Sequence, residues 1–155
     1  MGKTFKGELT AHDQKFALCV ARFNSFLTEQ LLEGAKDCLS RHGVKETAVD
    51  TYWVPGSFEL PYLAGKLLEK PKYDAIICLG AVVRGDTPHF DFIAAEVTKG
   101  IASLALKSGI PVIYGVITVD TLEQGIERAG TKAGNKGWDA ALSALEMTNL
   151  YRSLK

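Results

Sequence analysis

The sequence predicts an α/β domain of three layers, in which a four-stranded parallel sheet lies between two layers of helices. Two observations carry this prediction. Short runs rich in β-branched residues alternate with longer amphipathic runs, which is the pattern of parallel strands joined by crossover helices. The run 75–83 is apolar at almost every position, as expected for a strand that helices cover on both faces.

Four strands and four helices follow from this alternation. The strands are expected near Phe16–Ala21, Thr47–Val54, Asp74–Val83 and Val112–Val119. Apolar residues at helical spacing mark the helices. These are the stripe Leu27, Leu31, Ala35 and Cys38, the short helix Pro61–Leu68, the stripe Ile93, Val97, Ile101, Leu104 and Ala105, and the C-terminal stripe Trp138, Ala141, Leu142 and Leu145. Glycine or proline follows each of the first three helices, as is typical of helix ends.

The chain is expected to form one domain with an N-terminal arm. Its length of 155 residues suits a single hydrophobic core. It is 46% hydrophobic and 23% charged, which is an ordinary composition for a globular protein. Residues 1–14 carry no helical stripe, so we expect them to form the arm and residues 15–155 to form the domain.

The charge balance, the length of the apolar runs and the start of the chain indicate which partners and which location are expected. Lysine plus arginine and aspartate plus glutamate both number 18, which gives no broad basic surface for nucleic acid or an anionic membrane. A membrane-spanning helix needs about 20 apolar residues, and the runs 75–83 and 112–119 are far shorter. The start of the chain lacks the apolar core of a signal peptide. We therefore expect a cytoplasmic protein with no membrane and no nucleic-acid partner.

The sequence contains no motif for a metal or a nucleotide. The cysteines Cys19, Cys38 and Cys78 are widely spaced and form neither a Cys-x-x-Cys pair nor a Cys/His metal pattern. Cys19 and Cys78 lie in strand-like runs, which favours small buried side chains. There is no Walker pattern and no Gly-x-Gly-x-x-Gly after a strand, which weighs against nucleotide triphosphates and dinucleotides.

Polar and aromatic residues gather where three predicted strands end. Phe23 and Asn24 follow the first strand, the segment 55–59 follows the second, and the segment 84–89 follows the third. In a parallel sheet, ligands bind beyond the carboxyl ends of the strands, where loops and helix N-termini converge. The three segments therefore predict one site.

The segment after the third strand has the features of a phosphate site. Gly85 lets the backbone approach a ligand closely, and Pro88 suits the first turn of a helix. Free N–H groups in such a turn, at the positive end of the helix dipole, bind anions. A plain turn capped by Asp86 or Thr87 is the alternative. His89 favours the phosphate site, because a histidine there can transfer protons near neutral pH.

The remaining segments fit a flat polar ring and a phosphate, and each has a structural alternative. Phe23 can stack on a heterocycle or cover the core. Ser57 and Glu59 can bind a polyol or a uracil-like ring, or cap a helix. Arg128 offers a planar fork of donors for a phosphate. The glycine- and lysine-rich segment 127–137 around it would also suit a solvated connector between helices.

Four segments carry a family resemblance. They are Ala21–Asn24 (ARFN), Val54–Pro61 (VPGSFELP), Gly80–Asp91 (GAVVRGDTPHFD) and Arg128–Gly137 (RAGTKAGNKG). In sequence and order they resemble the signature blocks of the 6,7-dimethyl-8-ribityllumazine synthases, across nearly the whole chain. The resemblance implies a flavodoxin-like fold and the penultimate step of riboflavin synthesis. In that step, 5-amino-6-(D-ribitylamino)uracil condenses with 3,4-dihydroxy-2-butanone 4-phosphate, releasing phosphate and water without a metal or a coenzyme.

The resemblance also implies roles for individual residues. Phe23 would stack on the pyrimidine, and His89 would transfer protons. The other contacts to the ribitylaminouracil would come from Ser57, Phe58, Glu59, Ala81, Val82, Val83 and Tyr114. The butanone phosphate would be bound by Asp86, Thr87 and Arg128. Tyr114 stands where many members have phenylalanine, which keeps the aromatic ring and adds a hydroxyl.

The resemblance extends to assembly. Sites of the family lie between neighbouring subunits, with Tyr114 and Arg128 supplied across the interface. The join 130–134 has no inserted residues, as in members whose pentamers close into icosahedral capsids. We therefore expect a homo-oligomer, a pentamer that assembles into a capsid, and an association with riboflavin synthase. The arm 1–14 is expected to add to the sheet edge of a neighbour.

Two other functions remain open on the same scaffold. An archaeal-type riboflavin synthase would combine two lumazines and use no phosphate, so the phosphate residues argue against it. A non-catalytic carrier of flavin or lumazine would have no need of His89 beside a phosphate.

Overall fold

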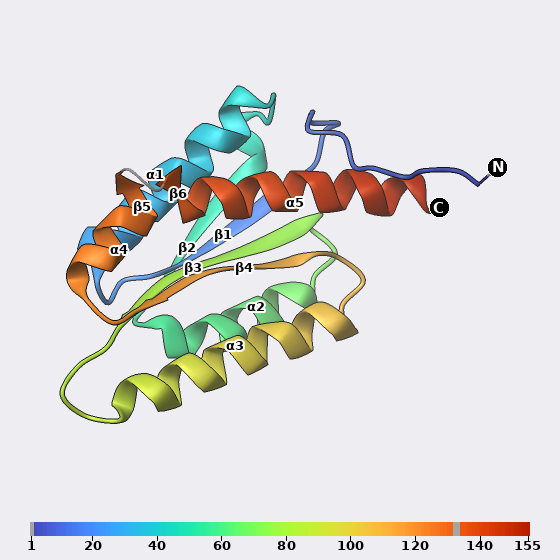
Figure 1. Ribbon diagram of the computed structural model, residues 1–155. Helices are drawn as coiled ribbons and strands as arrows, with labels where there is room; N and C mark the ends of the chain where they lie inside the picture. Colours follow the sequence, from blue (N-terminus) through green and yellow to red (C-terminus); the bar gives the residue numbers. More distant parts are fainter. Residues whose placement is uncertain (1, 132–133) are drawn as a thin grey trace.

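Four parallel strands form a central sheet in the order β2-β1-β3-β4, and helices lie on both of its faces (Figure 1). The computed structural model describes residues 2–131 and 134–155. The strands are β1 (Phe16–Ala21), β2 (Val49–Val54), β3 (Ala75–Val83) and β4 (Val112–Val119). The predicted fold class, a flavodoxin-like α/β domain, is confirmed.

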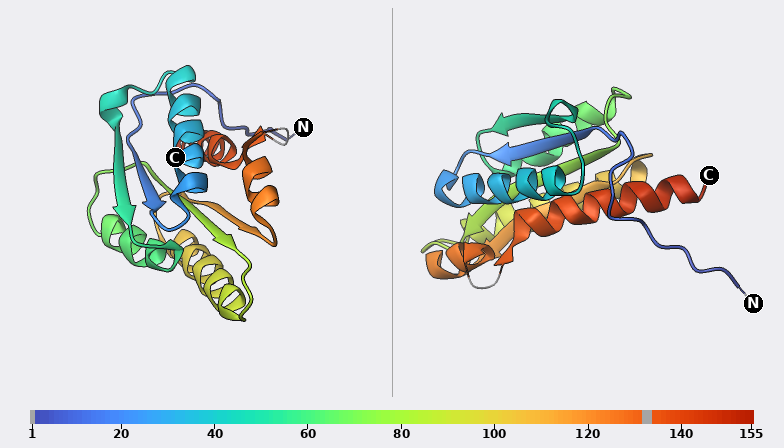
Figure 2. Two further views of the ribbon diagram at one scale, coloured as in Figure 1. Left: turned by 90° about the vertical axis from the view of Figure 1, so that its left-hand side faces the viewer. Right: turned by 90° about the horizontal axis from the view of Figure 1, so that it is seen from above.

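The helices form the two outer layers (Figures 1 and 2). One face of the sheet carries α1 (Ser25–Arg41) and α5 (Lys136–Ser153), and the other carries α2 (Leu60–Leu68) and α3 (His89–Lys107). A short helix, α4 (Leu122–Arg128), follows β4. Two 3-10 helices, η1 (Glu46–Ala48) and η2 (Ser57–Glu59), and a hairpin of β5 (Ala129–Thr131) and β6 (Gly134–Asn135) complete the described elements.

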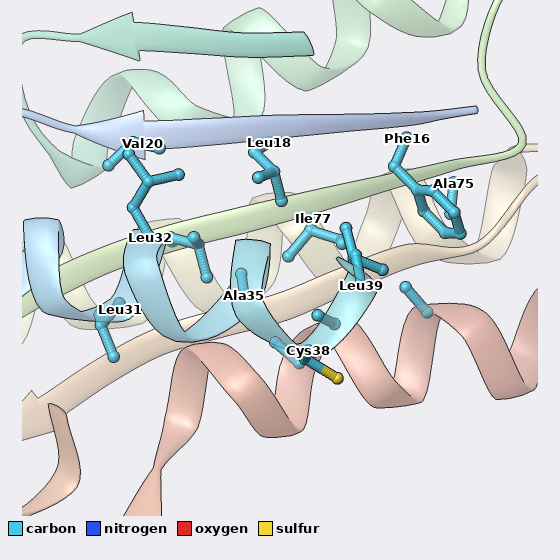
Figure 3. Packing of buried hydrophobic residues seen from close by; sticks show 14 of the residues in the cluster. Phe16, Leu18, Val20, Leu31, Leu32, Ala35, Cys38, Leu39, Ala75 and Ile77 are labelled. Carbon is cyan, nitrogen blue, oxygen red and sulfur yellow. The ribbon is translucent and has the colours of Figure 1, made fainter. Parts of the chain in front are cut away.

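Strand alternation produces a core on each side of the sheet. Successive side chains of a strand point to opposite faces. In β1, Phe16, Leu18 and Val20 pack against α1 and α5, as Figure 3 shows, whereas Ala17, Cys19 and Ala21 pack on the side of α2 and α3. All six are fully buried. The apolar run of β3 is likewise divided between the two cores, which explains its continuous hydrophobicity.

The structure differs from the sequence prediction in four places. The third strand begins at Ala75, one residue later than predicted, and the short helix α4 was not among the predicted helices. The second strand begins at Val49, because η1 occupies the three residues before it. The connector before α5 contains the β5–β6 hairpin, in which Gly130 and Gly134 adopt positive φ angles of 146° and 84°. Asn135 stabilises this connector by accepting hydrogen bonds from the first turn of α5 and donating one to Ala129 O at 2.8 Å. Within the predicted join 130–134, residues 132 and 133 lie outside the described residues.

The second half of the N-terminal arm is fixed to α5. The Asn149 amide donates to Glu8 O at 2.7 Å and to Thr10 O at 2.9 Å, and the buried Gln14 amide donates to Asn149 Oδ1 at 2.6 Å. The first residues of the arm extend away from the domain (Figure 2). Residues 2–6 are all exposed, so this part of the arm is the part available to a neighbouring chain.

The layer of α2 and α3 leaves large apolar side chains on the surface. Only Val97 and Ile101 of α3 are fully buried. Tyr62, Phe92 and Leu106 are 70%, 66% and 89% exposed. Within the described chain, no helix combines the length and hydrophobicity needed to cross a membrane. Apolar side chains on this scale indicate a protein-binding face.

Candidate active site

All but one of the predicted site residues line two separate cavities. The strand-end pocket has a volume of about 580 Å³ and lies where β1, β2 and β3 end. The edge pocket has a volume of about 350 Å³ and runs along the edge strand β4 toward α5. The two pockets share no lining residue.

The strand-end pocket contains most of the predicted residues. They are Phe23, Ser57, Phe58, Glu59, Ala81, Val82, Val83, Thr87 and His89. The predicted convergence of three strand-end segments is therefore seen in the structure. Tyr114 and Arg128 line the edge pocket instead, and Asp86 lines neither cavity.

The sheet topology explains the position of the strand-end pocket. The ladder between β1 and β3 ends at the pair Val20–Leu79, while β3 remains paired with β4 as far as Val83. The segment 81–83 of β3 therefore extends past β1 with one edge toward the pocket. The order of the strands also reverses between β1 and β3, which is where ligands bind in such sheets. Backbone groups of this segment can bind the edge of a planar ring.

The turn after β1 holds Phe23 over this pocket. Its backbone N–H donates to Pro55 O at 2.9 Å, which joins the first loop to the second. Asn24 has a left-handed conformation, with φ 63°, and its side-chain amide donates to Ala81 O at 2.9 Å. The Phe23 ring is 71% exposed, although it is large and apolar. An exposed ring held by its own backbone can stack on a flat ligand.

Ser57 depends on a close approach to Gly80. The Ser57 hydroxyl is buried and has no hydrogen-bond partner among the described residues. A Cβ atom at Gly80 would lie 2.5 Å from Ser57 Oγ, so β3 requires glycine at this position. A buried hydroxyl without a partner is costly unless a ligand or water supplies one. Because this hydroxyl is closed off from solvent against Gly80, it can bind a polar ligand in the pocket only after a small local movement.

The segment before α3 has features of both predicted possibilities, the phosphate-binding turn and the plain turn capped by a side chain. Helix α3 begins at His89, and Pro88 precedes it with φ −70°. The His89 N–H donates to Thr87 Oγ1 at 3.3 Å, so Thr87 acts partly as the capping residue that the alternative requires. Thr87 and His89 are both exposed and both line the pocket. The N-terminus of α3 therefore faces the strand-end pocket, where its dipole favours an anion.

The edge pocket contains two basic side chains, Arg128 and Lys136, and one acidic side chain, Asp139. Arg128 lies at the end of α4, and Lys136 lies at the start of α5, where its ammonium is 3.8 Å from Asp139 Oδ2. The Tyr114 hydroxyl lies 2.8 Å from Thr98 Oγ1 on α3. The hydroxyl that distinguishes this tyrosine from phenylalanine is thus already hydrogen-bonded within the chain.

Sequence reasoning missed several lining residues. Phe90 and Ile93 line the strand-end pocket, and Lys136 lines the edge pocket. Lys136 directly follows Asn135, the capping residue of α5, so a capping pattern at Asn135 would have placed it in a first helical turn. Asn24 was expected at the site as part of the segment after the first strand, but no signal in the sequence identifies its hydrogen bond to Ala81 O.

The three cysteines take no part in either pocket. Cys19, Cys38 and Cys78 are free and buried, as was predicted for Cys19 and Cys78. Burial raises the pKa of Cys38 to about 11, so this thiol stays protonated at neutral pH. Cysteine nucleophiles are therefore absent from the chemistry of the two described pockets.

Residues 13–152 match the family model of 6,7-dimethyl-8-ribityllumazine synthase. The match includes every residue that lines the two pockets and nearly all of the chain. The chain belongs to this family. Lumazine synthases are transferases of riboflavin biosynthesis, which agrees with a pair of pockets suited to a polar ring and an anion.

Proposed function

We propose that the protein condenses 5-amino-6-(D-ribitylamino)uracil with 3,4-dihydroxy-2-butanone 4-phosphate to form 6,7-dimethyl-8-ribityllumazine, phosphate and water. The observation that supports this most strongly is the strand-end pocket, which combines an exposed aromatic ring, a strand edge that β1 leaves unpaired, a buried hydroxyl and a helix N-terminus. These are the groups required to bind a heterocycle, a polyol and a phosphate.

In this proposal, the pyrimidine stacks on Phe23 and its polar edge binds the backbone of the segment 81–83. The ribityl chain binds Ser57, Phe58 and Glu59. Their positions fit this role, since the segment 57–59 forms the 3-10 helix η2 on the wall of the same pocket. Holding both reactants in one orientation supplies a large part of the rate acceleration in a condensation.

The keto-phosphate is proposed to bind at the N-terminus of α3, with Asp86 and Thr87 in the turn and His89 as the proton-transfer residue. Condensation of the amine with the ketone forms an imine and expels water. Loss of a proton from the neighbouring carbinol carbon expels phosphate and leaves an enol, which regains a proton at its terminal carbon to give a ketone. Attack of the ribitylamino nitrogen on this ketone closes the ring and expels a second water. Each step moves a proton near the bound phosphate. An exposed imidazole on the pocket wall suits this role, because imidazole can both accept and donate a proton.

We further propose that a complete site is formed by the strand-end pocket of one subunit and the edge pocket of its neighbour. Tyr114 and Arg128 line a different cavity from His89 in their own chain, which supports a role in the site of another subunit. The exposed apolar face of α2 and α3 supports a homo-oligomer. The pentamer, its capsid and the association with riboflavin synthase belong to this proposal.

The free cysteines are consistent with the reducing cytoplasm, which is the proposed location. The two alternative functions, an archaeal-type riboflavin synthase and a non-catalytic carrier, predict different outcomes with these substrates. A riboflavin synthase would convert two lumazines, and a carrier would convert neither substrate.

A turnover assay tests the proposal. Purified protein is mixed with both substrates, and the absorbance of the lumazine and the release of inorganic phosphate are followed together. We expect both to rise in equal amounts, and only when both substrates are present. Conversion of added lumazine to riboflavin, or binding without turnover, would overturn the proposal.

A further inference from the structure

Arg84 lies next to the strand-end pocket without lining it. It directly follows β3, and its backbone N–H donates to Val119 O at 2.9 Å. Its side chain makes three further contacts. Arg84 Nε donates to Asp120 Oδ1 at 2.8 Å, Nη1 lies 3.4 Å from Asp91 Oδ1, and the guanidinium lies 4.4 Å from the centre of the Phe90 ring.

These contacts join β3, β4 and α3 around the short segment 85–89. Asp120 directly follows β4, whereas Phe90 and Asp91 belong to the first turn of α3. Arg84 itself is the residue immediately before the segment 85–89. The guanidinium of Arg84 therefore links the first turn of α3, which follows the segment 85–89, to the ends of the strands β3 and β4. The hydrogen bonds to the carboxylates, that of Asp120 foremost, raise the pKa of Arg84 above its usual value, so the group stays charged.

The segment has few other constraints. In the part of the chain that the structure describes, its one side-chain hydrogen bond runs from His89 N to Thr87 Oγ1, and at 3.3 Å it is long. Residues 84–89 are all exposed. Surface ion pairs contribute little to global stability, but exposed loops open locally at a small cost in free energy. A contact too weak to affect unfolding can therefore determine where Thr87 and His89 lie.

The choice of arginine fits this geometry. A planar guanidinium donates in fixed directions to two carboxylates and can also stack on an aromatic ring. A lysine ammonium would keep the positive charge but could not reproduce this arrangement. The same charge near a phosphate site could instead act by attraction at a distance. The two roles of Arg84, positioning and attraction, predict opposite effects when Asp120 is removed.

We propose that Arg84 is a positioning residue, whose contacts with Asp120, Asp91 and Phe90 hold the segment 85–89 in the geometry that the keto-phosphate requires. This inference rests on the proposed function, in which Thr87 and His89 act on that substrate. Arg84 acts through the segment and touches neither reactant. The pyrimidine, bound mainly by other loops, should be little affected by its loss.

Steady-state kinetics of the assembled protein test the inference. Arg84→Gln should lower kcat/KM for the keto-phosphate by about ten-fold, below the roughly hundred-fold cost of a 1 Å misplacement of a reacting group. The KM for the pyrimidine should stay near its wild-type value. Arg84→Lys should resemble Arg84→Gln, because the charge alone does not restore the planar guanidinium that contacts both carboxylates. Asp120→Ala should also lower kcat/KM, whereas attraction at a distance predicts a gain.

Arg41→Gln is the matched control. Arg41 Nε donates to Asp37 Oδ1 at 2.9 Å on the exposed surface of α1, almost the same geometry, and neither residue lines the two candidate pockets. Its kinetics should be those of the wild type. Amide hydrogen exchange in the unliganded variants gives an independent readout. Exchange in the segment 85–89 should accelerate in Arg84→Gln and Asp120→Ala, and stay unchanged in Arg41→Gln.

Wild-type kinetics in Arg84→Lys, improved use of the keto-phosphate in Asp120→Ala, or unchanged exchange in the segment would each overturn the inference. Equal losses for both substrates would also overturn it, since they would indicate a general structural role. Failure of the proposed function looks different, because the wild-type protein itself would then form no lumazine. The exchange experiment would still decide whether Arg84 holds the segment in place.

Discussion

At the scale of single residues, His89 and Arg128 occupy separate pockets of one chain and are assigned separate tasks. His89 is exposed at the first position of α3, beside the turn that is proposed to bind phosphate. Arg128 lies at the end of α4, where its Nη1 is 3.5 Å from Gln124 O, a long contact that leaves the guanidinium able to bind a ligand.

His89→Ala should slow turnover while leaving assembly intact. General acid–base assistance contributes about 10²–10⁴-fold, and the residual rate reflects reactants that are still bound and oriented. Stopped-flow absorbance of the product measures this rate, and light scattering checks the particle size. Turnover at the wild-type rate in this variant would remove His89 from the mechanism.

Arg128→Ala should weaken use of the keto-phosphate and leave pyrimidine binding almost unchanged. A hydrogen bond to a charged group contributes about 1.5–3 kcal/mol, or roughly ten- to a hundred-fold in affinity. Arg128→Lys should fall between the alanine variant and the wild type, because it keeps the charge and loses the fork. Inorganic phosphate should inhibit the alanine variant less than the wild type. Loss of pyrimidine affinity with phosphate inhibition intact would show that Arg128 serves the other substrate.

Most site residues could be predicted because they follow strand ends, and the strand ends follow from local patterns. His89 and Thr87 are examples, since a strand, a glycine turn and a helix start are all visible in the sequence. The hydrogen bond of Asn24 to Ala81 O could not be predicted, because it joins residues that are far apart in the chain. The hydrogen bond between Arg84 and Asp120 could not be predicted for the same reason.

At the scale of elements, hydrophobic periodicity was sufficient for β1 and β4, whose observed bounds equal the predicted ones. It was insufficient before β2, where η1 shortens the strand, and after α4, where glycines with positive φ form a hairpin. Both exceptions depend on backbone conformation, which periodicity of side chains does not report.

The packing of α5 on α1 provides a test at this scale. A Cβ atom at Gly137 would lie 1.9 Å from Leu31 O, so Gly137→Ala must separate the two helices. Overpacking of this kind destabilises a protein by about 1–3 kcal/mol or more. At Gly65 in α2, the nearest atom, Leu104 Cδ2, is 3.6 Å away. Gly65→Ala should therefore be neutral or stabilising by up to about 1 kcal/mol. Urea unfolding midpoints compare the two, and equal midpoints would contradict this account of the interface.

At the scale of the whole molecule, the account predicts a large closed assembly. The exposed apolar residues of α2 and α3, and the extended residues 2–6 of the arm, have partners only in other subunits under this proposal. Light scattering at neutral pH in phosphate buffer should report a capsid-sized particle. A particle of pentamer size would refute the capsid and keep the pentamer, and a monomer would refute both.

Mixing two impaired variants tests most directly whether the active site is shared between subunits. His89→Ala damages only the strand-end pocket, and Arg128→Ala damages only the edge pocket. If the variants are unfolded together and reassembled in equal amounts, about one site in four combines two intact pockets, because each side of a heterologous interface is filled at random.

Turnover is measured at low keto-phosphate concentration, with each variant reassembled alone as the control. We predict that the mixture exceeds the mean of the two controls and approaches about a quarter of wild-type activity. Activity equal to that mean would show that His89 and Arg128 act within one chain, and would contradict the shared site.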